Sequence, residues 1–379
     1  MLFAIVIASI SAVHAQNRKV NLQENLPFEE VLKQAQAEDK YIFLDFGSLT
    51  CKPCLYIKQH VLTLDSVADF INPRFVSVDY NLGAEKDRLR KLYNVIGEPV
   101  LLILDKHGNL MHRMVGRMEG DELMARFRQG LDTDNNLVAL MAKYDRGARD
   151  VGFIMQYLET LRISRDVDIM NAVLKDYLSG PLENLKKPEI YDVFLKYNED
   201  LLSREMLYVF DNRTEFYELF GARALDAKIR NLFMNKSRFY LYGHNPPADD
   251  PNFHRLLEYV QKTDFPDASE WLVYLRPAKY KYKDWVAMAE EVDKAFDFNI
   301  IKGWSGDSFK EMMVTQFMMY CDDADALQYA VRWCEDLKED ANADRIANLE
   351  KSQARVLDKI ARVEKDKSGD IEWTDIDND

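Results

Sequence analysis

Short apolar runs alternate with helix-period segments over the first 131 residues, and this order limits the fold of the chain more than any other feature. The runs Tyr41–Phe46, Phe75–Asp79 and Val100–Leu104 have the length and composition of buried strands. Helices are predicted over 27–39, 51–61, 66–71, 85–93 and 120–130, and a further strand over 110–115 after a turn at 106–109. This order predicts a three-layer α/β domain over residues 16–132, with helices on both sides of a central mixed sheet.

The pattern changes after Asp132. From 136 to 363 the chain shows helical periods and no convincing strand, and one of the predicted helices spans 216–234. Breaks fall at Gly180-Pro181, Asn245-Pro246-Pro247 and Gly303–Gly306. The sequence therefore predicts an all-α domain of helical hairpins, with a faint similarity to tetratricopeptide repeats near its end. Residues 364–379 carry seven acids against two lysines and are predicted to form a disordered tail.

The start of the chain has the pattern of a secretory signal. Leu2–Ile10 is apolar, and Val13-His14-Ala15 places small side chains where a signal peptidase cleaves. The basic residue that normally precedes the apolar run is missing, so an uncleaved anchor or a first core strand is the alternative. We expect residues 1–15 to be a signal peptide and the protein to be extracytoplasmic, in a bacterial periplasm.

Charge and cysteine content exclude several classes of function. A formal net charge of −14 and a pI near 5.1 argue against binding to nucleic acid or to anionic membranes. Four cysteines are too few for a fold held together by disulfides. Two of them, Cys321 and Cys334, are predicted to be buried apolar residues, too far apart along their helices for a disulfide. The alternative is that one of them resolves a mixed disulfide.

The other two cysteines form the motif Cys51-Lys52-Pro53-Cys54, which follows a strand and begins a helix. Free N–H groups and the helix dipole at such a position stabilise a thiolate, and Lys52 adds a cation beside Cys51. Pro53 suits the first helical turn, where an N–H has no partner. Cys51 is therefore predicted to attack a partner disulfide and Cys54 to resolve the product, closing a Cys51–Cys54 disulfide.

A zinc site is the alternative interpretation of a C-x-x-C motif. It needs two further ligands at suitable spacing. His60 lies too far along the same helix, and no second C-x-x-C exists. We therefore predict no metal, and no organic cofactor either, because the cysteines themselves carry the electrons.

Several positions around the motif resemble the thioredoxin family. Phe43-Leu44-Asp45-Phe46 is similar to the central strand of that family, and Gly97-Glu98-Pro99-Val100 to its cis-proline loop. The resemblance covers Leu22–Leu131 and is strongest to exported members, such as the periplasmic domain of the transmembrane disulfide reductase. It implies that Asp45 accepts the proton of the resolving thiol, and that Pro99 docks a substrate strand.

The chain also departs from this family. Thr50 stands where a tryptophan is usual, Lys52-Pro53 separates the cysteines, and Glu98 replaces an uncharged residue. A carboxylate near Cys51 opposes the effect of Lys52 on the thiolate.

Two functions follow from these features. The leading hypothesis is an exported thiol–disulfide oxidoreductase, reducing rather than oxidising. It acts on protein thiols and disulfides, has Lys52, Pro53 and Glu98 at its substrate surface, and takes its electrons from a membrane donor. The rival is a non-catalytic docking or assembly module.

Overall fold

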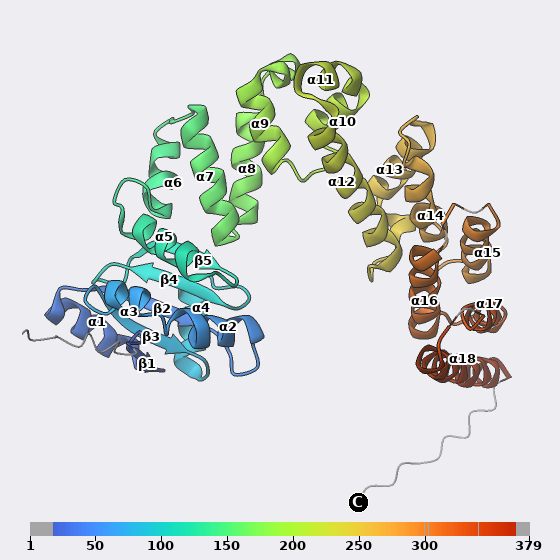
Figure 1. Cartoon of the computed structure of the whole chain (residues 1–379), viewed down its shortest axis with the longest axis horizontal. Coiled ribbons are helices and arrows are strands. Elements are labelled where there is room, and N and C mark those ends of the chain that lie inside the picture. Colours follow the sequence, from blue (N-terminus) through green and yellow to red (C-terminus); the bar gives the residue numbers. More distant parts are fainter. Residues whose placement is uncertain (1–17, 299, 302, 340, 369–379) are drawn as a thin grey trace, which may run out of the picture. The chain divides into compact units, whose positions relative to one another are not determined.

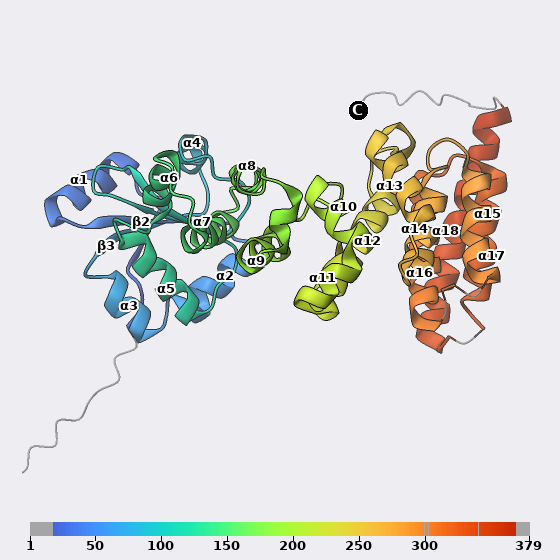
Figure 2. The same cartoon turned by 90° about the horizontal axis from the view of Figure 1, so that it is seen from above.

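The chain forms two compact units that divide between Asn184 and Leu185, and each is described by itself (Figures 1 and 2). The computed structural model describes residues 18–298, 300–301, 303–339 and 341–368. The predicted signal segment 1–15 and the tail beyond Ser368 lie outside these residues. Residues 364–368, predicted to belong to the tail, instead continue the last helix.

The first unit is built on a five-stranded mixed sheet in the order β1-β3-β2-β4-β5. Its strands are β1 (Leu22–Glu24), β2 (Tyr41–Phe46), β3 (Phe75–Tyr80), β4 (Val100–Leu104) and β5 (Leu110–Val115). β1, β3 and β2 are parallel, whereas β4 and β5 run antiparallel to their neighbours. The three residues of β1 are too few to carry a periodic signal, and this strand was not predicted.

Helices cover both faces of the sheet and create two apolar cores. On one face lie α1 (Phe28–Glu38) and α4 (Ala84–Leu92), which bury Phe28, Val31 and Leu89 against the strands. On the other face lie α2 (Lys52–Tyr56), a π-helical turn (Ile57–Val61), α3 (Asp65–Ile71) and α5 (Gly120–Leu131). Their apolar residues form the second core. The three-layer α/β fold predicted from the sequence is therefore confirmed.

The first unit continues beyond the sheet through α6 (Leu137–Asp145), α7 (Val151–Ser164) and α8 (Val167–Tyr177). α6 and α7 pack against β5. Buried His112 on β5 accepts a hydrogen bond at Nδ1 from the backbone N–H of Leu137, 3.2 Å away, at the start of α6. These contacts hold the three helices in the same unit as the sheet.

The second unit is helical throughout the residues that the structure describes. It contains α9 (Pro188–Tyr197), α10 (Arg204–Asp211), α11 (Arg213–Phe220), α12 (Ala222–Tyr242), α13 (Pro251–Lys262), α14 (Ala268–Ala278), α15 (Trp285–Asp297), α16 (Gly303–Tyr320), α17 (Ala324–Asp336) and α18 (Ala343–Ser368). Short 3₁₀ turns occupy Leu182–Lys186, where the units divide, and Pro247–Asp249. Consecutive helices pack together from α13 to α15 and from α16 to α18. None of the described helices is long and apolar enough to cross a membrane.

Two predicted details of this unit were wrong. The single helix expected over 216–234 is two helices, α11 and α12, because Gly221 between them has φ 83° and ψ 151°. Residues with a Cβ rarely adopt that conformation. The break expected at Gly303–Gly306 is instead the start of α16.

Candidate redox site around Cys51 and Cys54

One edge of the sheet brings together segments that are distant in sequence. Phe46 at the end of β2 pairs with Val100 at the start of β4, which pairs in turn with Val115 at the end of β5. This edge therefore carries the loop from β2 to Cys51, together with Pro99 directly before β4 and Gly116 directly after β5. The Glu98–Pro99 peptide is cis, and the Gly116 N–H donates to the Pro99 carbonyl at 3.0 Å.

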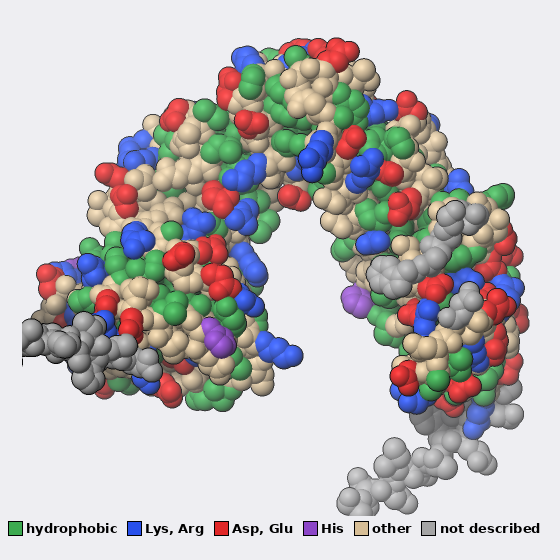
Figure 3. Space-filling model, in the orientation of Figure 1, with side chains coloured by type: hydrophobic (Ala, Val, Ile, Leu, Met, Phe, Trp, Pro, Cys, Tyr) green, Lys and Arg blue, Asp and Glu red, His purple; other side chains and the backbone are tan. Residues whose placement is uncertain are grey.

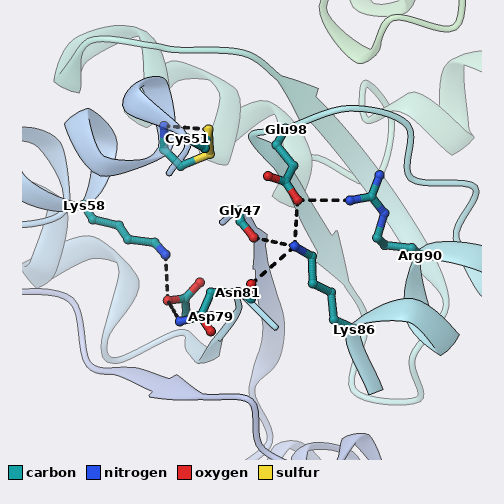
Figure 4. Close-up of a disulfide and its surroundings, with 9 residues drawn as sticks. Gly47, Cys51, Lys58, Asp79, Asn81, Lys86, Arg90 and Glu98 are labelled. Atoms are coloured by element: carbon teal, nitrogen blue, oxygen red, sulfur yellow. Dashed lines mark hydrogen bonds and ion pairs between the residues drawn. A yellow bond between two sulfur atoms is a disulfide. The ribbon is translucent and has the colours of Figure 1, made fainter. Parts of the chain in front are cut away.

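Cys51 and Cys54 are joined by a disulfide at the start of α2 (Figure 4). Cys51 caps the helix, and its Sγ accepts a hydrogen bond from the Cys54 N–H at 3.3 Å. Cys54 is buried, whereas Cys51 is partly exposed. Pro53 lies in the first turn, and Lys52 is exposed beside it. A partner molecule can therefore reach the first sulfur, while the second is shielded.

Glu98 lies closer to the sulfurs than its place in the sequence alone revealed. One of its carboxylate oxygens and the two cysteine sulfurs all lie within 4.8 Å of one another. The carboxylate receives the Lys86 ammonium at 2.6 Å and the Arg90 guanidinium at 3.0 Å. Partial burial raises the pKa of Glu98, but hydrogen bonds from Lys86 and Ser48 and the two cations outweigh it, so the pKa lies below its usual value. Glu98 is therefore a charged carboxylate next to the disulfide, with its own counterions.

Asp45 is the most buried of the three acids at the site, which are Asp45, Asp79 and Glu98. It is 1% exposed on β2, and neither carboxylate oxygen has a hydrogen-bond partner among the described residues. Burial raises its pKa to about 7, the charges of Asp79 and Glu98 add to the rise, and the Lys58 cation opposes it. Asp45 can therefore hold or release a proton near neutral pH, as a proton acceptor for a buried thiol must.

Sequence reasoning missed four charged residues of this site: Lys58, Asp79, Lys86 and Arg90. Lys58 forms a 2.6 Å ion pair with largely buried Asp79. One signal for Lys58 was available, because it follows Cys54 by four residues and so shares its helix face. The other three are brought in by β3 and α4, and nothing in their local sequence marks them.

Gly47 lies beside the side chains of Cys54, Lys58 and Lys86. A Cβ built on it would lie 3.2 Å from Cys54 Sγ and 3.8 Å from Lys58 Nζ. Its carbonyl oxygen accepts a 2.6 Å hydrogen bond from Lys86 Nζ, which also contacts the Asn81 carbonyl at 3.4 Å (Figure 4). The absence of a side chain at position 47 therefore leaves room for the resolving cysteine, which a Cβ there would crowd.

Among the residues that the structure describes, the donor set at this site is incomplete for a structural zinc ion. Cys51, Cys54 and Glu98 provide three ligand atoms, one fewer than a structural zinc site needs, and His60 does not join this group. The Glu98 carboxylate is already bound by two cations. The arrangement fits sulfur chemistry better than metal binding.

The fold and the site together define a thiol–disulfide domain of the thioredoxin kind. Residues 28–131 match the family model of a thioredoxin-like domain. These residues are therefore a thioredoxin-like domain, and the helical remainder of the chain lies outside the match.

Three solved structures illustrate the similarity. The chain is 33% identical to a candidate disulphide-isomerase from Bacteroides thetaiotaomicron, over 31% of this chain and 98% of that one, with a TM-score of 0.29. It is 25% identical to a thioredoxin from Thermus thermophilus, over 30% and 88% of the two chains, with a TM-score of 0.27. It is 20% identical to the oxidised C-terminal domain of DsbD from Neisseria meningitidis, over 27% and 91%, with a TM-score of 0.25. No curated protein matched the chain.

Proposed function

We propose that this protein is an exported thiol–disulfide oxidoreductase that reduces disulfides in partner proteins. The observation that carries the proposal is the Cys51–Cys54 disulfide, whose first sulfur is partly exposed at a helix start and whose second is buried near Gly47. A helix start favours a thiolate at the first position, and a partly exposed thiolate is the attacking group of such enzymes.

The reaction has two steps. In the reduced protein the Cys51 thiolate attacks a partner disulfide, so that a Cys51–partner bond forms and the second partner sulfur leaves as a thiolate. Asp45 then takes the proton of Cys54, and the Cys54 thiolate attacks Cys51 Sγ. The Cys51–Cys54 disulfide forms, and the partner is released with both of its sulfurs reduced.

Glu98 supports the reducing direction. A charged carboxylate close to the sulfurs disfavours the Cys51 thiolate, and this destabilises the dithiol form relative to the disulfide. A pair with a less stable dithiol form is the stronger reductant. Such a protein needs a source of electrons, and a membrane-bound donor on the periplasmic side fits the signal-like segment at residues 1–15.

The rival function is a docking module that does not exchange disulfides. Two departures from the family pattern favour it: Thr50 stands before the motif where a tryptophan is usual, and Glu98 stands before the proline where an uncharged residue is usual. The helical second unit then carries the binding function.

Insulin reduction by dithiothreitol separates the two functions. We expect the full-length protein to accelerate insulin precipitation, Cys51→Ser to abolish the acceleration, and Cys334→Ser, a matched change outside the site, to preserve it. Equal rates for the wild type and Cys51→Ser, together with unchanged capture of partners by the mutant, would establish the docking module instead.

Equilibration with glutathione, followed by quantifying free thiols, gives the direction of electron flow. We expect a reduction potential near −270 mV, the value typical of thioredoxin. A value near −120 mV, typical of strong oxidants of folding proteins, would overturn the reducing role.

A further inference from the structure

The link between α7 and α8 lies at the same edge of the sheet as the disulfide. It consists of Arg165 and Asp166, and Arg165 adopts a left-handed conformation with φ 54°. These residues, here called the α7–α8 corner, lie beyond residues 28–131, which match the family model. The corner is therefore an addition of this chain to the region that carries the redox motif.

The α7–α8 corner is linked by non-covalent contacts to both ends of the loop 93–99, whose last two residues are Glu98 and Pro99. Asp166 pairs with Arg113 at 2.7 Å, and Arg113 donates a second hydrogen bond to the Tyr93 carbonyl at 2.7 Å, where the loop begins. At the other end Gly116 binds the Pro99 carbonyl, and a Cβ on Gly116 would lie 3.5 Å from Arg165 Nη2. Arg165 therefore lies over the residue that holds Pro99.

The charges around this loop leave the Arg165 guanidinium available. Asp166 is neutralised by Arg113, and Glu98 by Lys86 and Arg90. Arg165 is exposed, and no carboxylate lies within ion-pair distance of it in the part of the chain that the structure describes. Figure 3 shows several Lys and Arg side chains along the margin of the first unit that carries α2 and α8.

The loops that carry Pro99 and Cys51 each present an exposed apolar side chain. Ile96 on the loop is 76% exposed, and Leu49, two residues before Cys51, is 66% exposed. A partner segment that lies against these loops at Cys51 has apolar side chains beside it, and the Arg165 guanidinium stands next to Gly116, which holds Pro99. The complementary partner chemistry is a segment with a carboxylate near its disulfide.

We propose that Arg165 is a specificity-determining residue of the redox site, and that it selects protein segments carrying Asp or Glu beside their disulfide cysteine. This inference rests on the proposed function, because it assigns a substrate class to the same site. The α7–α8 corner supplies the contact that the shorter thioredoxin-like region lacks.

The test uses the reduced full-length protein and three peptides, each with one cysteine blocked by a neutral 2-thiopyridyl group. The peptides carry Glu, Gln or Lys two positions before and after that cysteine. Attack of the Cys51 thiolate on the peptide sulfur releases 2-thiopyridone, whose absorbance gives the second-order rate constant. The measured quantity is the ratio of the Glu-peptide rate to the Lys-peptide rate. This ratio is compared between variants, because the net charge of −14 by itself favours the Lys peptide in all of them.

We expect Arg165→Gln to lower this ratio about two- to fivefold, the range for one exposed charge pair. Arg165→Glu lowers it further, because attraction becomes repulsion, and raising the salt to about 1 M reduces the difference between the variants. Lys175→Glu makes the same charge change as Arg165→Glu on an exposed residue of α8 near the far end of that helix, and leaves the ratio within about twofold.

Equal ratios in the wild type, Arg165→Gln and Arg165→Glu would overturn the role of Arg165. A failure of the proposed function looks different, since the wild type would then release no more 2-thiopyridone than Cys51→Ser with any of the three peptides.

Discussion

Lys86 Nζ lies 2.6 Å from Glu98 Oε1 and 2.6 Å from the Gly47 carbonyl oxygen, so one largely buried cation joins the cis-proline loop to the strand end before the disulfide. The same contact sets the charge next to the two sulfurs. The Glu98 carboxylate is balanced there by the Lys86 and Arg90 cations. A substitution that removes the carboxylate leaves the cations to act on the Cys51 thiolate, and one that removes a cation leaves the carboxylate to act on it.

Glu98→Gln is therefore expected to make Cys51 more acidic. Without the carboxylate, Lys86 and Arg90 act as unbalanced cations beside the thiolate. We expect the reduced Cys51 thiol to become a stronger acid, and the reduction potential to rise by about 30 mV. The pH dependence of alkylation by iodoacetamide and equilibration with glutathione measure the two effects. Glu38→Gln, on an exposed carboxylate of α1, is the matched control, and an unchanged Cys51 pKa in Glu98→Gln would refute the expectation.

Asp45 is expected to reduce stability at neutral pH. Its pKa is about 7 in the folded chain against 3.8 for a free carboxyl, so between these values the folded state holds a proton that the unfolded state has lost. Stability therefore decreases as pH rises from about 4 to about 7. Asp45→Asn removes this loss, and we expect it to stabilise the first unit at pH 8 by up to about 4 kcal/mol, with little effect at pH 4.

Hydrogen exchange of peptides from β2 and β4 is the suitable measurement for Asp45→Asn. All five tryptophans follow residue 270, so tryptophan fluorescence reports on the second unit only. Asp87→Asn, on an exposed carboxylate of α4, is the control and is expected to change stability by less than about 1 kcal/mol. A gain for Asp45→Asn that is equal at pH 4 and pH 8 would contradict the linkage.

His112 is expected to act on stability with the opposite sign. Burial, and then the charge of Arg126, lower its pKa to about 4 from 6.5, so the unfolded state binds more protons between these values. Stability is therefore lost as pH falls from about 6.5 to about 4. An NMR titration of the ring carbons checks this expectation: the ring should stay neutral down to about pH 4, and protonation near pH 6.5 would disprove it. His112→Gln should reduce the acid sensitivity of the first unit over that range.

Cys321 and Cys334 are expected to be inert in the native protein. Both are free and fully buried, and burial raises their pKa values to about 12 and about 11. Such thiols react poorly with alkylating reagents. In a Cys51→Ser/Cys54→Ser double variant, mass spectrometry should detect alkylation only after denaturant is added. Labelling of either cysteine under native conditions would mean that the packing around it opens, and would favour the alternative of a second resolving thiol.

Residues that are close in sequence could be predicted well. The helix start at Cys51 follows from Pro53 and the preceding strand, and the turn before Leu110 from a polar Gly-containing segment, because each rests on local backbone preferences. The strands β2 and β4 were recognisable because each contains an unbroken apolar run of four or more residues. Gly221 shows the limit of such reasoning, since the helical pattern continues across it while its positive φ divides the helix.

Residues that meet through the sheet could not be predicted in the same way. Glu98 was assigned to the substrate surface from its place before Pro99, but its two counterions come from α4, whose sequence reads as an ordinary polar helix. Lys58 in the π-helical turn pairs with Asp79 on β3, and no local pattern encodes the packing that brings them together. Long-range charge pairs depend on the register of strands and on which helix face meets them, and a single sequence does not specify either.

The packing of α6 and α7 against β5 has a practical consequence for protein expression. β5 is an edge strand of the sheet, and an uncovered edge invites pairing with other chains. A fragment cut at residue 132 would uncover this strand and remove the Leu137 N–H from His112. A fragment ending near Asn184 keeps both, so the redox-active part of this chain is best purified with its three extra helices attached.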